Sequence, residues 1–278
     1  HHQRSPPSGT ACTNRFLVAS RRMQDFRPCR IILLRHGQSL GNVDDAAYVT
    51  TPDWRIPLTD KGRQQASEAG LGLDDMIEPD GQIFVYHSPY TRCKETVQEL
   101  CSHIDRTRII ASREDPRISE QQFGNFQDME EVRQSKAERA KFGRFYYRFP
   151  SGEAGLDVYS RVSSFITTLV RDCHQYSHAG YDLDRMNVVI VTHGLALRLF
   201  LMRWFQFSVE EFEASHNPGN AQVITMHKKI GPKGGHKWYE LDARDRESLN
   251  LPECCGVPKN VRMHSLDEDD CEEKPVEQ

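Results

Sequence analysis

No stretch of this 278-residue sequence approaches the roughly 20 consecutive apolar residues that a membrane-spanning helix requires. The sequence also has no strong excess of one charge, because 36 Lys and Arg residues stand against 40 Asp and Glu residues, for a net charge of -4. This balance argues against a protein that binds nucleic acid or a membrane surface with its whole exterior. Any basic binding site must therefore be local.

Cysteine patterns typical of disulfide frameworks and zinc sites are missing as well. The eight cysteines are scattered along the chain and include no Cys-x-x-Cys pair, which indicates reduced thiols rather than cross-links or a structural metal site. We therefore expect a reducing compartment, the cytoplasm, with a plastid or another organelle as the alternative. No internal repeat of the solenoid type is present, and the length favours one large α/β domain with tails.

Short aliphatic runs mark the strands of the expected sheet. The run from Ile31 to Leu34 is too short for a helix and too apolar for a strand with one wet face, so it predicts a strand buried on both faces. Residues 83–86, 108–111 and 188–191 are further strand candidates, and residues 222–226 resemble a last strand. The sequence therefore predicts an α/β fold with a mostly parallel central sheet, and ligands usually bind at the carboxyl edge of such a sheet.

Two helix starts are expected after the first two strands. Thr59 suits the N-cap of a helix that runs to about Met76. Ser88 suits the next N-cap, with Pro89 at the first helical position and Arg92 in the first turn. A cation in the first turn interacts unfavourably with the helix dipole, so we infer that the role of Arg92 is to bind an anion.

Two more helices follow from apolar residues at helical spacing, around residues 158–173 and 195–205. Arg198 and Arg203 interrupt the apolar character of the second, and we interpret both as snorkelling or ion-paired residues rather than catalysts. Two aliphatic runs lead directly into polar turns, Arg35-His36-Gly37 and Thr192-His193-Gly194. If both strands are parallel, the two histidines can converge at one edge of the sheet.

These segments together resemble the histidine phosphatase superfamily, which includes cofactor-dependent phosphoglycerate mutases and many phosphomonoesterases. The resemblance extends from about residue 31 to residue 226 and is strongest to plant phosphoglycerate-mutase-like proteins. It implies a three-layer α/β/α sandwich with a mostly parallel central sheet. The motifs that carry it are Arg35-His36-Gly37, Leu58-Thr59, Ser88 to Arg92, Glu120 to Phe126 and Thr192-His193-Gly194.

The resemblance also implies a role for each site residue. His36 matches the nucleophile that becomes phosphorylated, and Glu120 matches the general acid. Arg35, Arg92 and His193 match the groups that hold the phosphoryl oxygens. Further phosphate or substrate contacts are expected from Gln38, Ser39, Asn42 and Gly194. We expect no metal and no cofactor, because Arg35 and Arg92 would repel a dication placed between the two histidines.

A basic and aromatic segment follows the expected acid, at about residues 127–152. One reading is a solvated helix face, which is what most charge runs are. The other is a lid over the pocket, as the resemblance implies. In that reading the segment selects a substrate with more than one anionic group through Arg139, Lys141 and Arg144.

The two ends of the chain differ from its centre in composition. Residues 1–29 contain no acidic residue before Asp25, which is typical of a flexible arm or of an organellar targeting segment. Residues 30–228 should form the catalytic domain. Residues 229–278 are first rich in Lys and Gly and then acidic, and they predict a disordered tail.

The expected activity is that of a metal-independent phosphomonoesterase acting through phosphohistidine on a small phosphorylated metabolite. One alternative is phosphoryl transfer of the phosphoglycerate mutase type. The interval from Glu120 to His193 is shorter than in the glycolytic mutases and contains no Arg-Arg pair, which favours the phosphatase. The other alternative is a non-catalytic binding or assembly protein on the same fold. The sequence does not indicate an oligomeric state.

Overall fold

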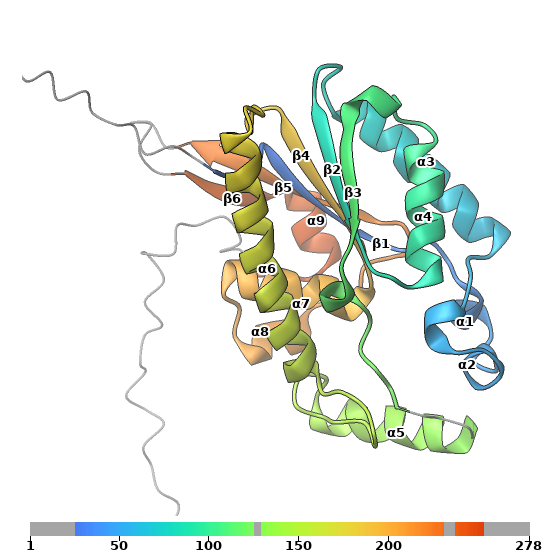
Figure 1. Cartoon of the computed structure of the whole chain (residues 1–278). Helices are drawn as coiled ribbons and strands as arrows, with labels where there is room; N and C mark the ends of the chain where they lie inside the picture. The colour runs from blue at the N-terminus through green and yellow to red at the C-terminus, as the bar shows by residue number, and fades with distance from the viewer. Residues whose placement is uncertain (1–25, 125–128, 231–236, 253–278) are drawn as a thin grey trace, which may run out of the picture.

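The computed structural model describes residues 26–124, 129–230 and 237–252, and Figure 1 shows their arrangement. Residues 1–25 of the predicted arm (residues 1–29), the start of the lid segment and the acidic tail lie outside the described residues. The described strands form a six-stranded sheet in the order β3-β2-β4-β1-β5-β6. The neighbouring pairs among β1 to β4 run parallel, whereas β5 and β6 pair in the antiparallel direction.

The strands and helices agree closely with the alternation that the sequence predicts. The strands are β1 (Arg30–Arg35), β2 (Gln82–His87), β3 (Ile109–Glu114), β4 (Met186–Thr192), β5 (Val223–Ile230) and β6 (Lys237–Leu241). The longer helices are α3 (Asp60–Met76), α4 (Thr91–Cys101), α5 (Met129–Phe142), α6 (Gly155–His178) and α7 (Gly194–Phe205). Short helical segments are α1 (Leu40–Val43), α2 (Ala47–Thr50), α8 (Val209–Ala214) and α9 (Ala243–Ser248), with 3-10 turns at Asp53–Arg55, Arg106–Arg108 and Pro116–Ile118.

Helices cover both faces of the sheet, which confirms the three-layer sandwich. Alternate residues of β1 face opposite layers, because successive side chains of a strand point to opposite faces. Ile31 and Leu33 belong to the core formed with α6 and α7, whereas Ile32 and Leu34 pack against α3 and α4. This two-sided burial explains the unbroken aliphatic run in the sequence. No helix among the described residues is long and apolar enough to cross a membrane.

All four parallel strands end at the same edge of the sheet. Figure 1 shows α5 below this edge, on the same side of the sheet as α1 and α2. The loops that follow the strands therefore lie between the sheet and α5. Every candidate site residue named from the sequence lies at the end of a parallel strand, in these loops, at a helix start next to them, or on the segment that contains α5.

Two sequence predictions about element boundaries are wrong. Ser88 is not an N-cap, because α4 begins at Thr91 with Tyr90 as its N-cap, and Pro89 therefore precedes the helix. The ordered domain also continues past residue 228, since β6 adds an edge strand and α9 follows it. This strand was not predicted, because it is short, only partly apolar and follows a stretch rich in Lys and Gly.

Candidate active site

The two histidines meet because β1 and β4 are neighbours in register. Arg35 pairs with Thr192 at the ends of these strands, so the next residue of each strand leaves the sheet at the same place. The backbone N–H of His36 donates to the Thr192 carbonyl at 2.9 Å. The ring centroids of His36 and His193 lie 5.2 Å apart with the rings at 63°. The structure thus places the two predicted site histidines side by side.

His36 is held in the tautomer that a nucleophile needs. Its Nδ1 lies 2.7 Å from the Gly37 carbonyl oxygen, which can only accept, so Nδ1 carries the proton. The lone pair of the neutral ring is therefore on Nε2. Burial, with the charge of Arg92 as the next cause, lowers the pKa of His36 well below its ordinary value of 6.5. The ring is neutral, and nucleophilic, at neutral pH.

His193 is fully buried and is oriented by the loop that follows β2. Its Nε2 lies 2.8 Å from the Ser88 hydroxyl, and the ring packs edge-on against Tyr90 at a centroid distance of 4.9 Å. Its Nδ1 is buried and has no hydrogen-bond partner among the described residues. Burial and the nearby Arg92 lower the pKa of His193 well below 6.5. Ser88 therefore orients the second histidine instead of capping α4.

Both predicted arginines lie near the two histidines, because the charge of each contributes to lowering the pKa of His36 and of His193. Arg35 donates from Nη1 to the Pro218 carbonyl at 2.7 Å, while its buried Nε has no partner among the described residues. Arg92, only 3% exposed, donates from Nη1 to both the backbone and the carboxylate of Asp53 at 2.8 Å. The anion beside Arg92 in the described structure is thus a protein carboxylate. The Arg92 guanidinium also stacks on Tyr90, 4.8 Å from the ring centroid.

The loop after His36 presents polar groups toward the same place. The Asn42 side-chain oxygen accepts hydrogen bonds from the Ser39 backbone at 3.0 Å and from Asn220 Nδ2 at 3.0 Å. Because that oxygen is occupied, the Asn42 amide nitrogen is the group that can donate to a phosphoryl oxygen. Gln38 instead uses its side-chain oxygen to accept from the Thr59 hydroxyl at 3.0 Å. A phosphate contact by Gln38 stays a prediction.

The start of α3 fixes this loop by close backbone approach. Thr59 caps the helix as predicted, because its hydroxyl accepts from the backbone N–H of Gly62 at 3.0 Å. A side chain at Gly62 would lie 2.0 Å from the Gln38 carbonyl oxygen, and one at Gly37 would lie 2.3 Å from the Gly62 carbonyl oxygen. The glycines allow the helix and the loop to touch. An ordinary capped helix therefore also braces the site.

The α7 helix begins directly at the site. His193 is its N-cap and Gly194 its first residue, so backbone N–H groups of its first turn lack partners within the helix and can bind an anion. A side chain at Gly194 would lie 2.6 Å from the Asn217 carboxamide. Glycine at this position lets the turn that contains Asn217 approach the site.

Glu120 lies in a loop that α6 holds through one arginine. Arg161 donates to the backbone carbonyls of Arg117, Ser119 and Glu120 at 2.8, 2.8 and 2.9 Å. It also pairs with both carboxylate oxygens of Glu153, at 3.0 and 2.9 Å. Burial raises the pKa of Glu120 above its ordinary value. A carboxyl group with a raised pKa keeps its proton to a higher pH than an ordinary glutamic acid does, which suits a general acid.

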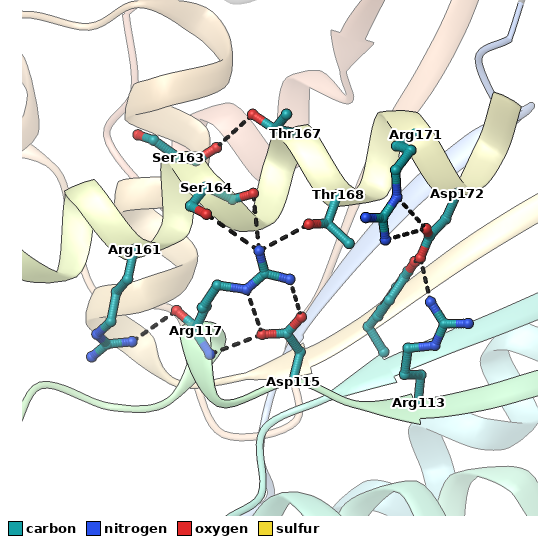
Figure 2. A network of polar contacts seen from close by, with 11 residues as sticks. Arg113, Asp115, Arg117, Arg161, Ser163, Ser164, Thr167, Thr168, Arg171 and Asp172 are labelled. Carbon is teal, nitrogen blue, oxygen red and sulfur yellow. Dashed lines mark hydrogen bonds and ion pairs between the residues drawn. The ribbon is translucent and has the colours of Figure 1, made fainter. Parts of the chain in front are cut away.

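A second set of polar contacts fixes the stem of this loop, as Figure 2 shows. The Arg117 side chain pairs with Asp115 at 2.5 and 2.9 Å and donates to Thr168 of α6 at 2.8 Å. Arg161 reaches the Arg117 backbone from the other side. The segment before Glu120 is therefore tied to α6 by its backbone and by its side chains.

Residues 119–124, which include Glu120, are called the acid loop below. Two cavities are lined by different residues of this loop, with Phe123 lining both. The aromatic cavity, of about 880 Å³, is lined by several aromatic residues: Tyr48, Trp54, Tyr90, Phe123 and Phe149. The arginine cavity, of about 510 Å³, contains Arg139, Arg144 and Arg198. Glu120 and Gln121 line the arginine cavity, whereas Gln122 and Gly124 line the aromatic cavity.

The three predicted lid residues do not all line the same cavity. Arg139 and Arg144 line the arginine cavity, whereas Lys141 is exposed and lines neither cavity. Arg198, interpreted from sequence as snorkelling or ion-paired, is only 3% exposed. It donates to Ser215 Oγ at 2.9 Å and to the Phe212 carbonyl at 2.7 Å, and forms no ion pair with a described residue. For Arg198 that interpretation is wrong, because Phe212 in α8 and Ser215, the C-cap residue of α8, supply neutral acceptors to the buried guanidinium.

Several supporting residues were not found from the sequence. Ser88 and Arg161 act on residues 105 and 41 positions away, at His193 and Glu120, so no local pattern marks them. The sequence shows Glu153 in a Gly-Glu dipeptide at residues 152–153, but it does not show that Glu153 pairs with Arg161. The turn at residues 217–220 contacts both Arg35 and Asn42, and no local pattern in its sequence indicates these contacts.

The arrangement can bind a phosphoryl group and transfer it. It combines an unprotonated imidazole nitrogen, two guanidiniums, a helix start and a carboxyl group with a raised pKa. These are the nucleophile, the charge stabilisers and the proton donor that phosphoryl transfer uses. In the part of the chain that is described, no three His, Cys, Asp or Glu side chains gather as metal ligands would.

Comparison with known proteins gives the same picture. A family model described as "Histidine phosphatase superfamily (branch 1)" matches residues 31–238. The chain is 49% identical over 214 residues to phosphoglycerate mutase-like protein AT74 of Arabidopsis thaliana, covering 75% of this chain and 67% of that protein. It is 29% identical over 288 aligned residues to broad-range acid phosphatase DET1 of Saccharomyces cerevisiae, covering 72% of this chain and 85% of that protein.

Solved structures share the fold at lower identity. A mycobacterial glucosyl-3-phosphoglycerate phosphatase in complex with VO3 superposes with a TM-score of 0.58 and 24% identity, covering 77% of this chain and 97% of that one. At this identity the likeness concerns the fold.

Proposed function

The chain belongs to the histidine phosphatase superfamily, and from that membership and the site geometry we propose that it is a metal-independent phosphomonoesterase. The observation that carries this proposal is the neutral His36, its Nδ1 bound to the Gly37 carbonyl and its ring 5.2 Å from His193. The substrate is a small phosphorylated metabolite. The name of one relative, a broad-range acid phosphatase, favours hydrolysis.

The reaction has two steps. First, Nε2 of His36 attacks phosphorus, so a P–N bond forms while the P–O bond to the leaving group breaks. Glu120 gives its proton to the departing oxygen. Arg35, Arg92, His193 and the Asn42 amide stabilise the charge on the equatorial oxygens.

Second, the Glu120 carboxylate takes a proton from a water molecule whose oxygen attacks the phosphohistidine. The P–N bond breaks, inorganic phosphate leaves, and His36 and protonated Glu120 are restored. Asp53 must share Arg92 with the phosphoryl group, and it can do so because its hydrogen bonds use Nη1 alone.

Phosphate release in the presence of a chelator tests this proposal. We expect hydrolysis of 4-nitrophenyl phosphate and of metabolite phosphates by the wild type, and loss of the covalent route in His36→Ala. An alkaline quench followed by mass spectrometry should detect one phosphoryl group on residue 36 of the wild type. Chelator-sensitive activity that persists in His36→Ala would overturn the proposed mechanism.

The same assay separates the alternatives. Adding 3-phosphoglycerate with 2,3-bisphosphoglycerate and measuring 2-phosphoglycerate tests for mutase activity. The interval between Glu120 and His193 lacks an Arg-Arg pair, so we expect hydrolysis to dominate. No turnover of any compound, with a folded protein, would favour a binding or assembly role instead.

A further inference from the structure

The arginine cavity lies next to the proposed general acid and is strongly cationic. Glu120 forms part of its wall, together with Leu195 at the start of α7. A leaving group that accepts a proton from Glu120 can therefore extend directly into this cavity. The three guanidiniums come from three separate segments, α5, the loop after it and α7.

None of these guanidiniums forms an ion pair with a carboxylate in the described part of the chain. Arg139 instead stacks on Phe149, 5.2 Å from the ring centroid. Arg198 donates only to neutral oxygens. Glu213 is the one other carboxylate on the wall, and its Oε1 accepts from the Phe145 backbone N–H at 2.7 Å. Three positive charges thus face two carboxyl groups, one of which, Glu120, is the proposed proton donor.

Burial and mutual repulsion disfavour the positive charges of two arginines in this cavity. Burial, and after it the nearby Arg144, lowers the pKa of Arg198 to about 10. Burial and Arg144 also lower the pKa of Arg139. Cations that repel one another and have no carboxylate partner gain most from an anion placed between them.

The aromatic cavity offers an internal comparison, because its charged residues are already neutralised. Lys136 pairs with Asp45 at 3.2 Å, and Asp53 pairs with Arg92 at 2.8 Å. The rest of its lining is mainly aromatic and small polar residues. An uncharged organic group suits the aromatic cavity, whereas an anionic group suits the arginine cavity.

We propose that the arginine cavity binds a second phosphate group on the leaving-group side of the substrate, so that the preferred substrates are bisphosphorylated metabolites. This inference rests on the proposed phosphatase function. The fork of a guanidinium fits phosphate in a bidentate manner. A phosphate dianion also compensates more of the surplus charge than a carboxylate does.

Matched synthetic substrates test this proposal without assuming a metabolite. Alkanediols from propane-1,3-diol to hexane-1,6-diol are used as monophosphates and as bisphosphates, and the corresponding phosphooxy-alkanoic acids test a carboxylate. We expect kcat/KM for the best bisphosphate to exceed that of its monophosphate by about 10²-fold, given two or three charge-assisted contacts. The carboxylate should fall between them. The optimal chain length measures the span from His36 to the cavity.

Arg139→Gln and Arg144→Gln, singly and together, locate the effect. The double variant should lose about 10-fold or more of the ratio between bisphosphate and monophosphate. Arg133→Gln is the matched control, because Arg133 is on the same helix with 70% of its side chain exposed. A ratio near one at every length, or an equal loss in the control, would overturn the proposal.

A binding measurement separates this inference from the proposed function. Calorimetric titration of hexane-1,6-diol bisphosphate and its monophosphate into His36→Ala needs no turnover. Tighter binding of the bisphosphate that is lost in Arg139→Gln/Arg144→Gln supports the cavity even if wild-type hydrolysis fails. Equal binding of both compounds refutes the cavity even if hydrolysis through His36 succeeds.

Discussion

Replacing Arg161 by Met tests how the proposed general acid is positioned. The variant keeps an apolar stem of similar length but removes the contacts to the carbonyls of residues 117, 119 and 120 and to Glu153. Arg161 touches no reacting atom in the proposed mechanism, so it is a positioning residue. Its loss should act mainly through Glu120, because all five of its hydrogen bonds go to the acid loop, to Arg117 just before it and to Glu153, whereas on His193 its charge is a minor cause of the lowered pKa.

The expected loss depends on the leaving group. Each hydrogen bond from a charged donor contributes about 1.5–3 kcal/mol, so losing three of them lets the acid loop shift. A displacement near 1 Å can reduce a rate by about 10²-fold, and general acid catalysis contributes about 10²–10⁴-fold in total. We therefore expect kcat/KM for an alkyl phosphate to fall about 10²-fold. 4-Nitrophenyl phosphate, whose leaving group needs no proton, should lose less than about 5-fold.

The assay compares kcat/KM for both substrates in wild type, Arg161→Met, Arg161→Lys and Glu120→Gln. Glu120→Gln should show the same leaving-group dependence, and adding Arg161→Met to it should cost little more, because the two act as a unit. Arg161→Lys should recover part of the activity by restoring the charge. Equal losses on both substrates, or fully multiplicative losses in the double variant, would refute the positioning role. Circular dichroism and thermal unfolding identify variants that fail to fold.

Two further predictions follow from the same site. The raised pKa of Glu120 and the lowered pKa of His36 predict a bell-shaped pH profile for alkyl phosphates. kcat/KM falls as rising pH deprotonates Glu120 and as falling pH protonates His36; an unchanged alkaline limb in Glu120→Gln would contradict this assignment. Gly62→Ala places a carbon 2.0 Å from the Gln38 carbonyl, so denaturant unfolding should show a loss of about 1–3 kcal/mol. Gly72→Ala in the same helix meets nothing within 4 Å and should stabilise by about 0.5–1 kcal/mol.

The sequence predicted the centre of the site better than its supports. His36 and His193 could be paired because both follow aliphatic runs long enough to identify as buried strands, and parallel neighbours end at one edge. Glu120 was expected only through a family resemblance, since a single acidic residue in a loop has no local signal. Ser88 looked like a helix cap because serine has the same local preference in either role.

Long-range contacts account for what could not be predicted. The hydrogen bonds that satisfy the buried Arg198 guanidinium come from Phe212 and Ser215, at the end of α8, which lie 14 and 17 residues away in the sequence. Nothing in an apolar helix indicates whether an arginine within it reaches water, a carboxylate or a backbone carbonyl. The edge strand β6 was missed because its pairing with β5 comes from the folded sheet rather than from a strong local pattern.

The acid loop gives the proposed chemistry a consequence for substrate range. Its residues form the wall between the two cavities, with Glu120 and Gln121 on the arginine side and Gln122 and Gly124 on the aromatic side. The Arg161 contacts fix this wall from α6. Glu120 lines the arginine cavity and not the aromatic cavity, so in the proposed mechanism a leaving group that takes its proton from Glu120 lies on the arginine side. The charge of the arginine cavity should then discriminate between leaving groups, because the proton donor is part of the same wall.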